Sequence, residues 1–280
     1  MKKKQLIVNA DDYGHTEGVS AGIREAHLHG LVSSTSAMMN RPYVRQALAH
    51  ALELAPRLGL GVHLCLTAGK PLLPPEKVPS LVQPDGTFFR ESEFLARLPI
   101  ISVEEVEAEW QAQVDLFCRL LGHAPDHLDS HHHTSYFTRE LFEAMLQLAE
   151  NLGCRIRRPF GEDSDDLPGE ETNLGLDQIM SAFESKGNTA KPLTTQGYFG
   201  SFYDEDASFE VLNEALEKMA HHETINSFEI MTHPAIVDEE LMEVSSYNLQ
   251  RDRERQILQD QRLVTFVDEH FELVRFGDLT

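Results

Sequence analysis

The 280-residue sequence has only three cysteines, Cys65, Cys118 and Cys154, and no Cys-x-x-Cys pair. An odd number of scattered cysteines argues against a disulfide framework and against a zinc site built from thiolates. We therefore expect each cysteine to be a small buried residue rather than a ligand or a nucleophile.

Positive charge is also scarce. The chain carries 24 basic and 46 acidic side chains, which gives a net charge of −22. Nucleic acid and anionic lipid surfaces would both be repelled by such a surface. The composition therefore indicates a solvated acidic protein with neither nucleic acid nor a membrane as a partner, although a local basic patch could still bind an anionic group.

Long apolar runs are absent as well. The basic start, residues 1–5, is followed by the short apolar run Leu6-Ile7-Val8 and then by Asn9. A signal peptide has an apolar stretch of about 7–15 residues, and a membrane span needs about 20. We therefore expect a cytoplasmic protein.

Short strand-like runs alternate with helical patterns along the chain. This order predicts a mostly parallel sheet with right-handed crossovers, and the length suits a single (β/α) barrel of about 250 residues. We expect an α/β fold, a (β/α) barrel that is distorted or irregular; a doubly wound open sheet is the alternative. Strands are expected at Gln5–Ala10, Val32–Met39, Leu60–Thr67, Asp126–Ser130, Arg155–Arg158, Ser227–Thr232 and Leu273–Phe276, and helices at Thr16–His29, Val44–Arg57, Thr138–Asn151, Ala207–Ala220 and Leu249–Val267.

Two segments interrupt this alternation within one expected domain, residues 1–280. Residues 70–90 hold five prolines and the turn Pro84-Asp85-Gly86, which is typical of an ordered loop over one end of a barrel and consistent with a lid. Residues 162–196 are acidic, rich in glycine and weakly periodic. They are expected to form a second covering loop or a mobile insertion.

Two adjacent carboxylates, Asp11 and Asp12, follow the first expected strand in the segment Asn-Ala-Asp-Asp-Tyr-Gly, residues 9–14. The C-terminal strand ends form the functional face of a parallel α/β protein. There, one carboxylate can bind a metal ion while the other remains free as a base. An ordinary strand-end turn is the alternative.

His63 lies in the segment Gly-Val-His-Leu-Cys-Leu-Thr, residues 61–67, which alternates with a period of two. The leucines and Val62 would face the helices, and His63 would point into a barrel with Gly61, Cys65 and Thr67. A single histidine on a strand is more often structural, so His63 gains weight as a ligand only from its companions.

Three consecutive histidines, residues 131–133, directly follow the strand expected at Asp126–Ser130. Neighbouring side chains of an extended chain point in opposite directions, so at most His131 and His133 share a face. A surface histidine tract is the alternative, but the place after a strand favours metal binding. Asp129 lies on the same face as His131 and could orient a ligand or remain structural.

A fourth segment, Met-Thr-His-Pro at residues 231–234, ends a late strand with His233. Histidine suits a general acid because its unperturbed pKa lies near neutrality, although a structural role is the simpler interpretation of this residue alone. Together, the four segments place carboxylates and imidazoles at expected strand ends. A set of two histidines and one aspartate leaves coordination positions open, as catalytic metal sites do.

These four segments, together with Gly-Leu-Val-Ser-Ser-Thr at 30–35, Gly-Lys-Pro-Leu at 69–72 and Thr-Thr-Gln-Gly at 194–197, resemble the YdjC-like carbohydrate deacetylases, which include chitooligosaccharide deacetylases. The resemblance runs from about residue 5 to about residue 250. It implies a (β/α)-barrel-like fold related to the NodB-type polysaccharide deacetylases. It also implies that an N-acetyl group is removed from an amino sugar with one bound divalent cation, usually magnesium.

By motif match, the resemblance implies that Asp12, His63 and His131 are the metal ligands, Asp11 the base and His233 the acid. This assignment agrees with the chemistry of amide hydrolysis, which needs a water nucleophile, a stabilised oxyanion and a proton for the leaving amine. The implied partner is a small carbohydrate, and a homodimer is expected by family resemblance.

Three points stay open at this stage. Two imidazole ligands suit zinc at least as well as magnesium, which prefers oxygen ligands. Arg158, after a strand-like run, could bind a sugar or phosphate oxygen or pair with an acidic neighbour. The alternatives to an amino-sugar deacetylase are a metal-dependent hydrolase of another amide or ester, and a carbohydrate-binding protein without catalysis; the presence of Asp11 beside the ligands favours an enzyme.

Overall fold

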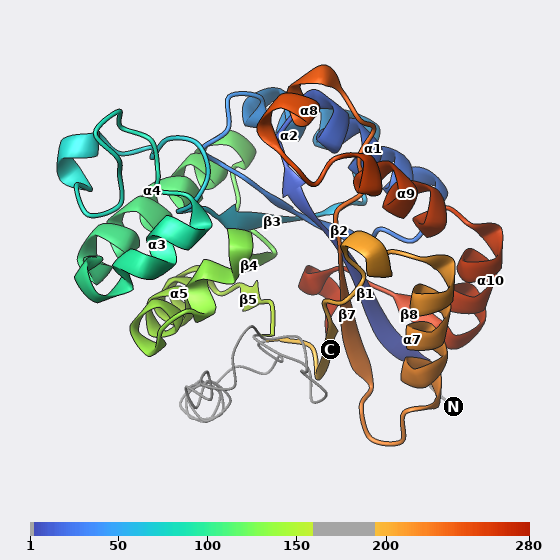
Figure 1. Ribbon diagram of the computed structural model, residues 1–280. Helices are drawn as coiled ribbons and strands as arrows, with labels where there is room; N and C mark the ends of the chain where they lie inside the picture. The colour runs from blue at the N-terminus through green and yellow to red at the C-terminus, as the bar shows by residue number, and fades with distance from the viewer. Residues whose placement is uncertain (1–2, 159–193) are drawn as a thin grey trace.

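A computed structural model describes residues 3–158 and 194–280. The strands of this part form one sheet in which every pairing is parallel, in the order β5-β4-β3-β2-β1-β7-β6, with β8 beside the first half of β1 (Figure 1). The strands are β1 (Lys4–Tyr13), β2 (Ser34–Ala37), β3 (Gly59–Leu64), β4 (His127–Ser130), β5 (Arg155–Ile156), β6 (Gly197–Phe199), β7 (Ser227–Thr232) and β8 (Phe271–Leu273).

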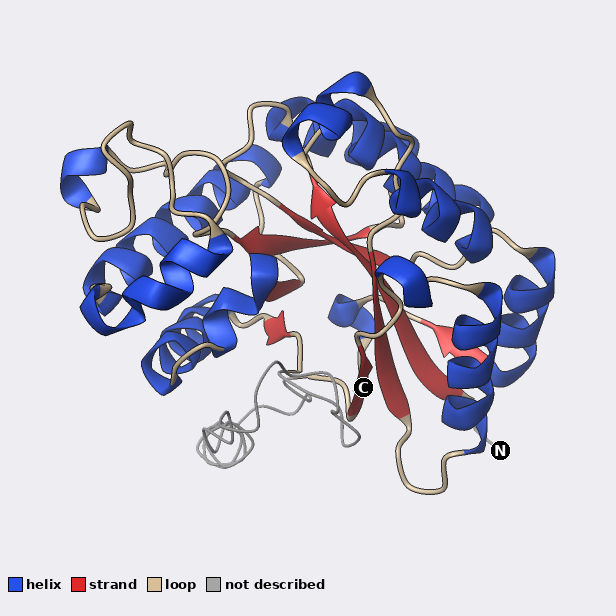
Figure 2. Ribbon diagram, in the orientation of Figure 1, coloured by secondary structure: helices blue, strands red, loops and turns tan. Residues whose placement is uncertain are grey.

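Helices cover the outside of the curved sheet (Figure 2). They bury the apolar sides of the strands, so the main hydrophobic core lies between sheet and helices. The helices are α1 (Glu17–His29), α2 (Val44–Leu54), α3 (Glu91–Arg97), α4 (Val103–Leu121), α5 (Arg139–Leu152), α7 (Phe209–His221), α8 (Glu239–Val244), α9 (Leu249–Leu258) and α10 (Gln261–His270).

The fold is a distorted (β/α) barrel, as the sequence predicts. From β1 to β5 each strand lies beside its predecessor in the chain, without the reversal of strand order that marks a doubly wound sheet. Among the described residues, the two ends of the strand path, β5 and β6, are not paired with each other. The barrel is therefore not closed by a strand pair at this point.

The central strand β1 carries the site because of its register with β7. Leu6, Ile7 and Val8 are fully buried, as expected for a strand covered on both sides. The pairing with β7 ends at Ala10 opposite Thr232. Because the C-terminal ends of parallel strands lie at the same edge of the sheet, the residues that follow Ala10 and Thr232 lie side by side.

The chain after β7 is held against α1 through two glycines. A Cβ atom on Gly18 would lie 2.2 Å from the Ile236 oxygen, and one on Gly22 would lie 2.4 Å from the Ile236 nitrogen. The Ile236 amide donates to the Gly18 carbonyl at 3.0 Å. Any larger side chain at either position would push this segment, and with it His233, away from β1.

The prediction of one long helix at Leu249–Val267 is wrong, because two helices, α9 and α10, fill this segment. Asp260 interrupts it with an extended backbone, and its side chain accepts a hydrogen bond from the Arg262 amide as the cap of α10. The Leu258 carbonyl, at the end of α9, instead accepts from the Leu31 amide at 3.0 Å. The last strand is also shifted, since β8 ends at Leu273 and a short helical turn begins at Phe276.

The sequence patterns assigned no element between residues 91 and 125, where the structure forms α3 and α4. The proline-rich segment 70–90 lies against α4 and is ordered by it. Glu109 of α4 accepts hydrogen bonds from the Leu72 and Leu73 amides, and Glu105 accepts from Ser80. The other expected loop, 162–196, lies almost entirely outside the described residues.

Candidate active site

A bulge at the end of β1 brings two consecutive carboxylates into one site. The register between β1 and β2 shifts between Ala10 and Tyr13, and Asp12 has a left-handed backbone with φ of 71°. Asp11 and Asp12 would point to opposite faces of a regular strand. The extra residue and the left-handed turn allow both side chains to be buried in the same polar cluster.

Asp12, His63 and His131, the metal ligands expected from the sequence, lie together as a candidate metal-ligand set. Asp12 Oδ1 lies 3.0 Å from His131 Nδ1 and 3.4 Å from His63 Nε2. The three ligand atoms all lie within 4.8 Å of one another. Asp12 Oδ1 is buried and faces both imidazole nitrogens, so a cation between them would bind all three atoms. These residues fit a divalent metal ion.

Asp129 fixes the orientation of His63. Its Oδ1 lies 2.7 Å from His63 Nδ1, which leaves Nε2 turned toward Asp12. Burial by itself lowers the pKa of His63, but the carboxylates of Asp129, Asp11 and Asp12 outweigh it and raise the pKa to about 9. A metal ion must therefore displace a proton from His63 when it binds. Of the two roles left open for Asp129, this contact favours the one in which it orients a candidate ligand, His63.

Arg251 of α9 holds the second oxygen of Asp12. Its Nη2 donates to Asp12 Oδ2 at 2.7 Å, and its Nε donates to the Tyr247 carbonyl. Burial would raise the pKa of Asp12, but Arg251 and then His131 lower it well below the usual value. Arg251 therefore keeps Asp12 ionised and leaves Oδ1 free to face the two histidines.

Arg157 is the centre of a fully buried charge cluster beside this set. It binds both oxygens of Asp11 at 2.6 and 2.7 Å, Glu229 at 2.7 Å and Asp129 at 3.1 Å. Asp11, His63 and Asp129 could also be taken for a metal-ligand group. Arg157 already neutralises both of these carboxylates, so we interpret them as an ion-pair cluster rather than a second metal site.

Asp11 is an ionised carboxylate outside the metal-ligand set. Burial would raise its pKa, but the charge and hydrogen bonds of Arg157 lower the pKa below the usual value for aspartate. Its orientation is fixed by Arg157 and by the Asn9 amide, which donates to Oδ1 at 2.9 Å. Asp11 can therefore accept a proton in one defined direction without changing its rotamer.

His233 follows β7 and faces Asp11, with 3.9 Å between Nε2 and Asp11 Oδ2. Its backbone amide donates to the buried carboxylate of Glu254. Burial lowers the pKa of His233 to about 4, against the opposing effect of Asp11, so the ring is neutral at neutral pH. Asp11 and His233, the base and the acid that the resemblance implies, thus lie close together, and their roles stay a prediction.

The three histidines after β4 take different directions, and the tract is not extended. His132 and His133 both have left-handed backbones, with φ of 54° and 55°. His131 reaches Asp12, whereas His132 Nδ1 lies 3.0 Å from Thr67 Oγ1 and His133 stacks on Tyr136. His131 is the one histidine of the triplet in the described metal-ligand groups.

Sequence reasoning missed both arginines that touch the two aspartates, Arg157 and Arg251. Arg158, which was expected to bind substrate, is half-buried, and its role stays a prediction. It is Arg157, one residue earlier, that enters the polar cluster. Because side chains alternate along an extended segment, only the register of β5 decides which arginine faces inward.

Comparisons with known proteins agree with this geometry. The family model of the YdjC-like proteins matches residues 5–269. A carbohydrate deacetylase of Thermoanaerobacter pseudethanolicus is 36% identical over 95% of each chain, and a chitooligosaccharide deacetylase of Proteus mirabilis is 34% identical over 98% of each chain.

A solved structure from Enterococcus faecalis V583, provisionally named a cellobiose-phosphate cleavage protein, is 34% identical over 98% of each chain. It superposes with a TM-score of 0.86. The family model covers every residue of the site described above, and these relatives align with nearly all of the sequence. The chain belongs to the YdjC-like protein family.

Proposed function

We propose that this chain is a metal-dependent carbohydrate deacetylase that removes N-acetyl groups from amino sugars or chitooligosaccharides. The names of the curated relatives support the substrate class. One observation carries the proposal: three metal-ligand side chains converge beside a carboxylate, Asp11, that the metal does not need. A site built only to hold a cation has no use for Asp11 and His233 beside the three ligands.

Asp12, His63 and His131 would hold the cation. When bound, a divalent cation supplies Lewis acidity toward an acetamide carbonyl and toward a water molecule. The family resemblance favours magnesium, whereas two imidazoles and one carboxylate suit zinc better, because magnesium prefers oxygen ligands. From the ligand chemistry we infer zinc or a similar transition metal.

Asp11 would act as the general base. It is ionised at neutral pH because Arg157 lowers its pKa, and Arg157 also fixes both of its oxygens. A carboxylate of low pKa is a weak base, so its contribution comes from its position beside the attacking water more than from its proton affinity.

His233 would act as the acid for the leaving amine. The ring is neutral in the resting protein, so it can donate a proton only after it has received one. The proton that Asp11 removes from water is available 3.9 Å away. Transfer of that proton to His233 and then to the amine nitrogen balances the reaction: water adds across the amide bond, and acetate and a free amine leave.

One variation of the substrate and one alternative function remain to be tested. The provisional name of the Enterococcus faecalis protein refers to a phosphorylated sugar, which makes phosphorylated sugars worth testing. A metal-dependent carbohydrate-binding protein would need the same three ligands but neither Asp11 nor His233.

None of the described helices could span a membrane. The cytoplasmic location, the homodimer and substrate binding by Arg158 stay predictions.

The test is acetate release by purified protein that is stripped of metal and reloaded with one cation at a time. Substrates are N-acetylglucosamine and its oligosaccharides, each with and without a phosphate group. We expect acetate release from at least one N-acetylated sugar, dependent on the cation. Stoichiometric metal binding without acetate release from any sugar would contradict the proposed activity and favour the binding protein.

A further inference from the structure

The segment that carries the candidate acid, His233, is bound to helix α9 through its backbone. The His233 amide donates to the Glu254 side chain at 2.5 Å. Two residues later, the Ala235 amide donates to the Arg251 carbonyl at 3.1 Å. Pro234, between them, has no amide hydrogen to donate. Every backbone donor from His233 to Ala235 is therefore used to bind α9.

The ring of His233 has no such anchor of its own. A catalytic histidine is commonly oriented by a hydrogen bond to its second ring nitrogen. Here Nδ1 is buried and has no hydrogen-bond partner among residues 3–158 and 194–280, and Nε2 lies 3.9 Å from Asp11 Oδ2. The rings of Tyr203 and Tyr247 make T-shaped contacts with it, with centroid distances of 5.4 and 5.9 Å. The place of the ring therefore depends on its backbone and on this packing.

Glu254 joins the backbone of His233 to the hydroxyl of Tyr247, and it is fully buried. Its Oε2 accepts from the His233 amide, and its Oε1 accepts from the Tyr247 hydroxyl. The same hydroxyl accepts from the Asp204 amide at 3.0 Å, so its proton is available for Glu254. A carboxylate fits this place because both of its oxygens accept. A glutamine would turn an NH₂ group toward one of the two donors.

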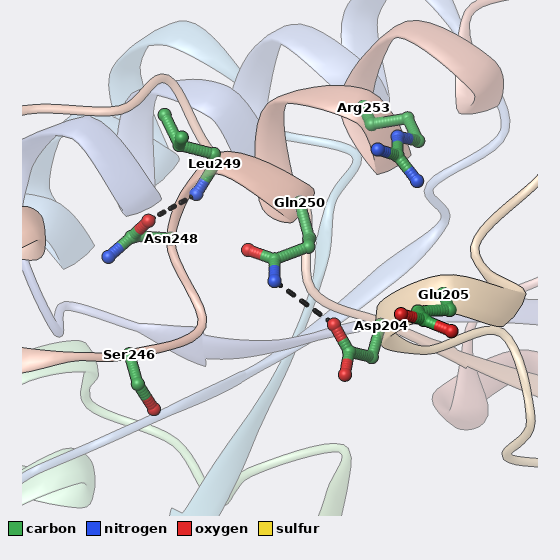
Figure 3. Close-up of a pocket in the computed structure, with 7 residues that line it drawn as sticks. All are labelled: Asp204, Glu205, Ser246, Asn248, Leu249, Gln250 and Arg253. Atoms are coloured by element: carbon green, nitrogen blue, oxygen red, sulfur yellow. Dashed lines mark hydrogen bonds between the residues drawn. The ribbon is translucent and has the colours of Figure 1, made fainter.

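The start of α9 connects this network to the metal-ligand set. Gln250 donates to the Asp204 carboxylate at 3.0 Å (Figure 3). The next residue, Arg251, donates to Asp12 Oδ2 at 2.7 Å. Glu254 follows Arg251 by about one helical turn, so both side chains leave the same face of the helix. One helix thus holds a candidate metal ligand through Arg251 and the candidate acid through Glu254.

We propose that Glu254 is the positioning residue of the candidate acid: by binding the His233 amide and the Tyr247 hydroxyl, it fixes the point at which the His233 ring delivers its proton. This inference rests on the proposed function and gives a part in it to a residue outside the metal-ligand set. Glu254 does not touch the substrate, since none of its surface is exposed. As the C–N bond of the acetamide breaks, the proton on His233 passes to the amine nitrogen, and Glu254 keeps the ring within reach of that nitrogen.

Such a role distinguishes two kinds of substrate. An amine is a poor leaving group and must receive a proton as the C–N bond breaks. The activated ester 4-nitrophenyl acetate releases a stabilised phenolate, which leaves without a proton. The candidate metal ligands and Asp11 act on the carbonyl and on water in both reactions. A displaced His233 should therefore slow acetate release from the amide far more than from the ester.

The test is Glu254→Gln in metal-loaded protein, assayed at about pH 8 because burial raises the pKa of Glu254 to about 7. We expect kcat for an N-acetylated amino sugar to fall by about 10- to 100-fold, with KM and metal content unchanged. Ester hydrolysis should change by less than about twofold. Tyr247→Phe keeps the aromatic ring and removes one donor, so it should show a smaller loss of the same kind. Glu243→Gln, at an exposed glutamate of α8, is the matched control.

A loss of equal size for amide and ester in a variant that melts like the wild type, or no loss for either, would overturn the proposal. If Glu254→Gln does not fold, Tyr247→Phe decides in the same way. The position of His233 is also measured without turnover, by ¹H–¹⁵N NMR. Its amide and ring resonances should shift in Glu254→Gln, whereas the ring resonances of His63 and His131 should not.

Unshifted His233 resonances would overturn the positioning role even in a fully active variant. Acetate release by the wild type reports on the proposed function separately. A wild type that releases no acetate from any sugar loses the deacetylase activity, and the NMR comparison still decides whether Glu254 positions His233.

Discussion

Arg157 grips Asp11 with two nitrogens, Nη1 on Oδ2 at 2.7 Å and Nη2 on Oδ1 at 2.6 Å, and neither residue is open to solvent. The planar guanidinium matches the carboxylate at both oxygens, which fixes the plane of Asp11 as well as its charge. The third arm of Arg157 is held by Glu229 at 2.7 Å. The direction in which Asp11 can accept a proton is therefore set by a buried side chain that lies outside the metal-ligand set.

Arg157→Lys should keep a positive charge in the cluster but lose the bidentate hydrogen bonding to Asp11. Misplacement of a catalytic group by about 1 Å costs about a hundredfold in rate, so we expect kcat to fall by about that factor. The metal content should not change, because Arg157 pairs with Asp11, Asp129 and Glu229 and not with the three candidate metal ligands. Steady-state acetate release and metal analysis measure the two effects, with the exposed Arg139→Lys as control. An unchanged kcat would show that the orientation of Asp11 is unimportant.

Asp129→Asn should weaken metal binding by about 10- to 100-fold, since carboxylates that orient ligating histidines contribute about that much. An asparagine oxygen can still accept from His63 Nδ1, but it no longer raises the basicity of the ring. Metal competition with a fluorescent chelator measures the affinity. Glu229→Gln is a matched control: it removes another carboxylate from the Arg157 cluster without touching His63. Equal losses in both variants would assign the effect to the cluster rather than to His63.

A bound cation should raise the melting temperature. At a free concentration of 100 times Kd, it stabilises the fold by about 2.7 kcal/mol, which corresponds to a shift of about 5–10 °C for a chain of this size. At equal free concentrations we expect zinc to give a larger shift than magnesium, because two of the three ligands are imidazoles. The shift should disappear in His131→Ala. A larger shift with magnesium would contradict the inferred preference.

His127 should make the fold sensitive to acid. Its ring is fully buried, stacks on Phe276 at 3.9 Å, and has no hydrogen-bond partner among the described residues. Burial lowers its pKa to about 4, below the value of about 6.5 in an unfolded chain. The unfolded state therefore binds the proton more tightly, and stability is lost as the pH falls from about 6.5 to about 4.

His127→Phe removes this titration and preserves the stack. Relative to the wild type, it should gain about 2–3 kcal/mol in free energy of unfolding between pH 7.5 and pH 4.5. Urea unfolding at the two pH values measures the gain. His29→Phe, at an exposed histidine of α1, should show no such pH-dependent gain. Parallel pH profiles for wild type and His127→Phe would mean that His127 is already protonated in the fold, or that its pKa is the same in both states.

The sequence was most informative where a single strand determines the position of a site residue. The strand before Asp11, the alternation around His63 and the strand before His131 were readable because local spacing determines which side chains reach a strand end. The amphipathic pattern of α4, with Val106, Trp110 and Val114 at intervals of four, was equally local and was overlooked.

Features that depend on tertiary contacts were not readable. Nothing in the sequence around Arg251 indicates that α9 packs where it can reach Asp12, 239 residues away in the chain. The break at Asp260 was missed because a charged helical pattern continues across it. The end of α9 depends on a distant residue, since the Leu31 amide donates a hydrogen bond to the Leu258 carbonyl. The bulge that turns both aspartates into the site likewise depends on the register with β2.

The central claim, a metal-dependent deacetylase with Asp11 as its base, is tested most directly by the Asp11→Asn variant. This change keeps the shape of the side chain and leaves Asp12, His63 and His131 intact, so the variant should bind metal stoichiometrically. We predict that its rate of acetate release from N-acetylated sugars is lower than that of the wild type by about 10²- to 10⁴-fold, the usual contribution of a general base. Acetate release at the wild-type rate by metal-loaded Asp11→Asn protein would contradict the account.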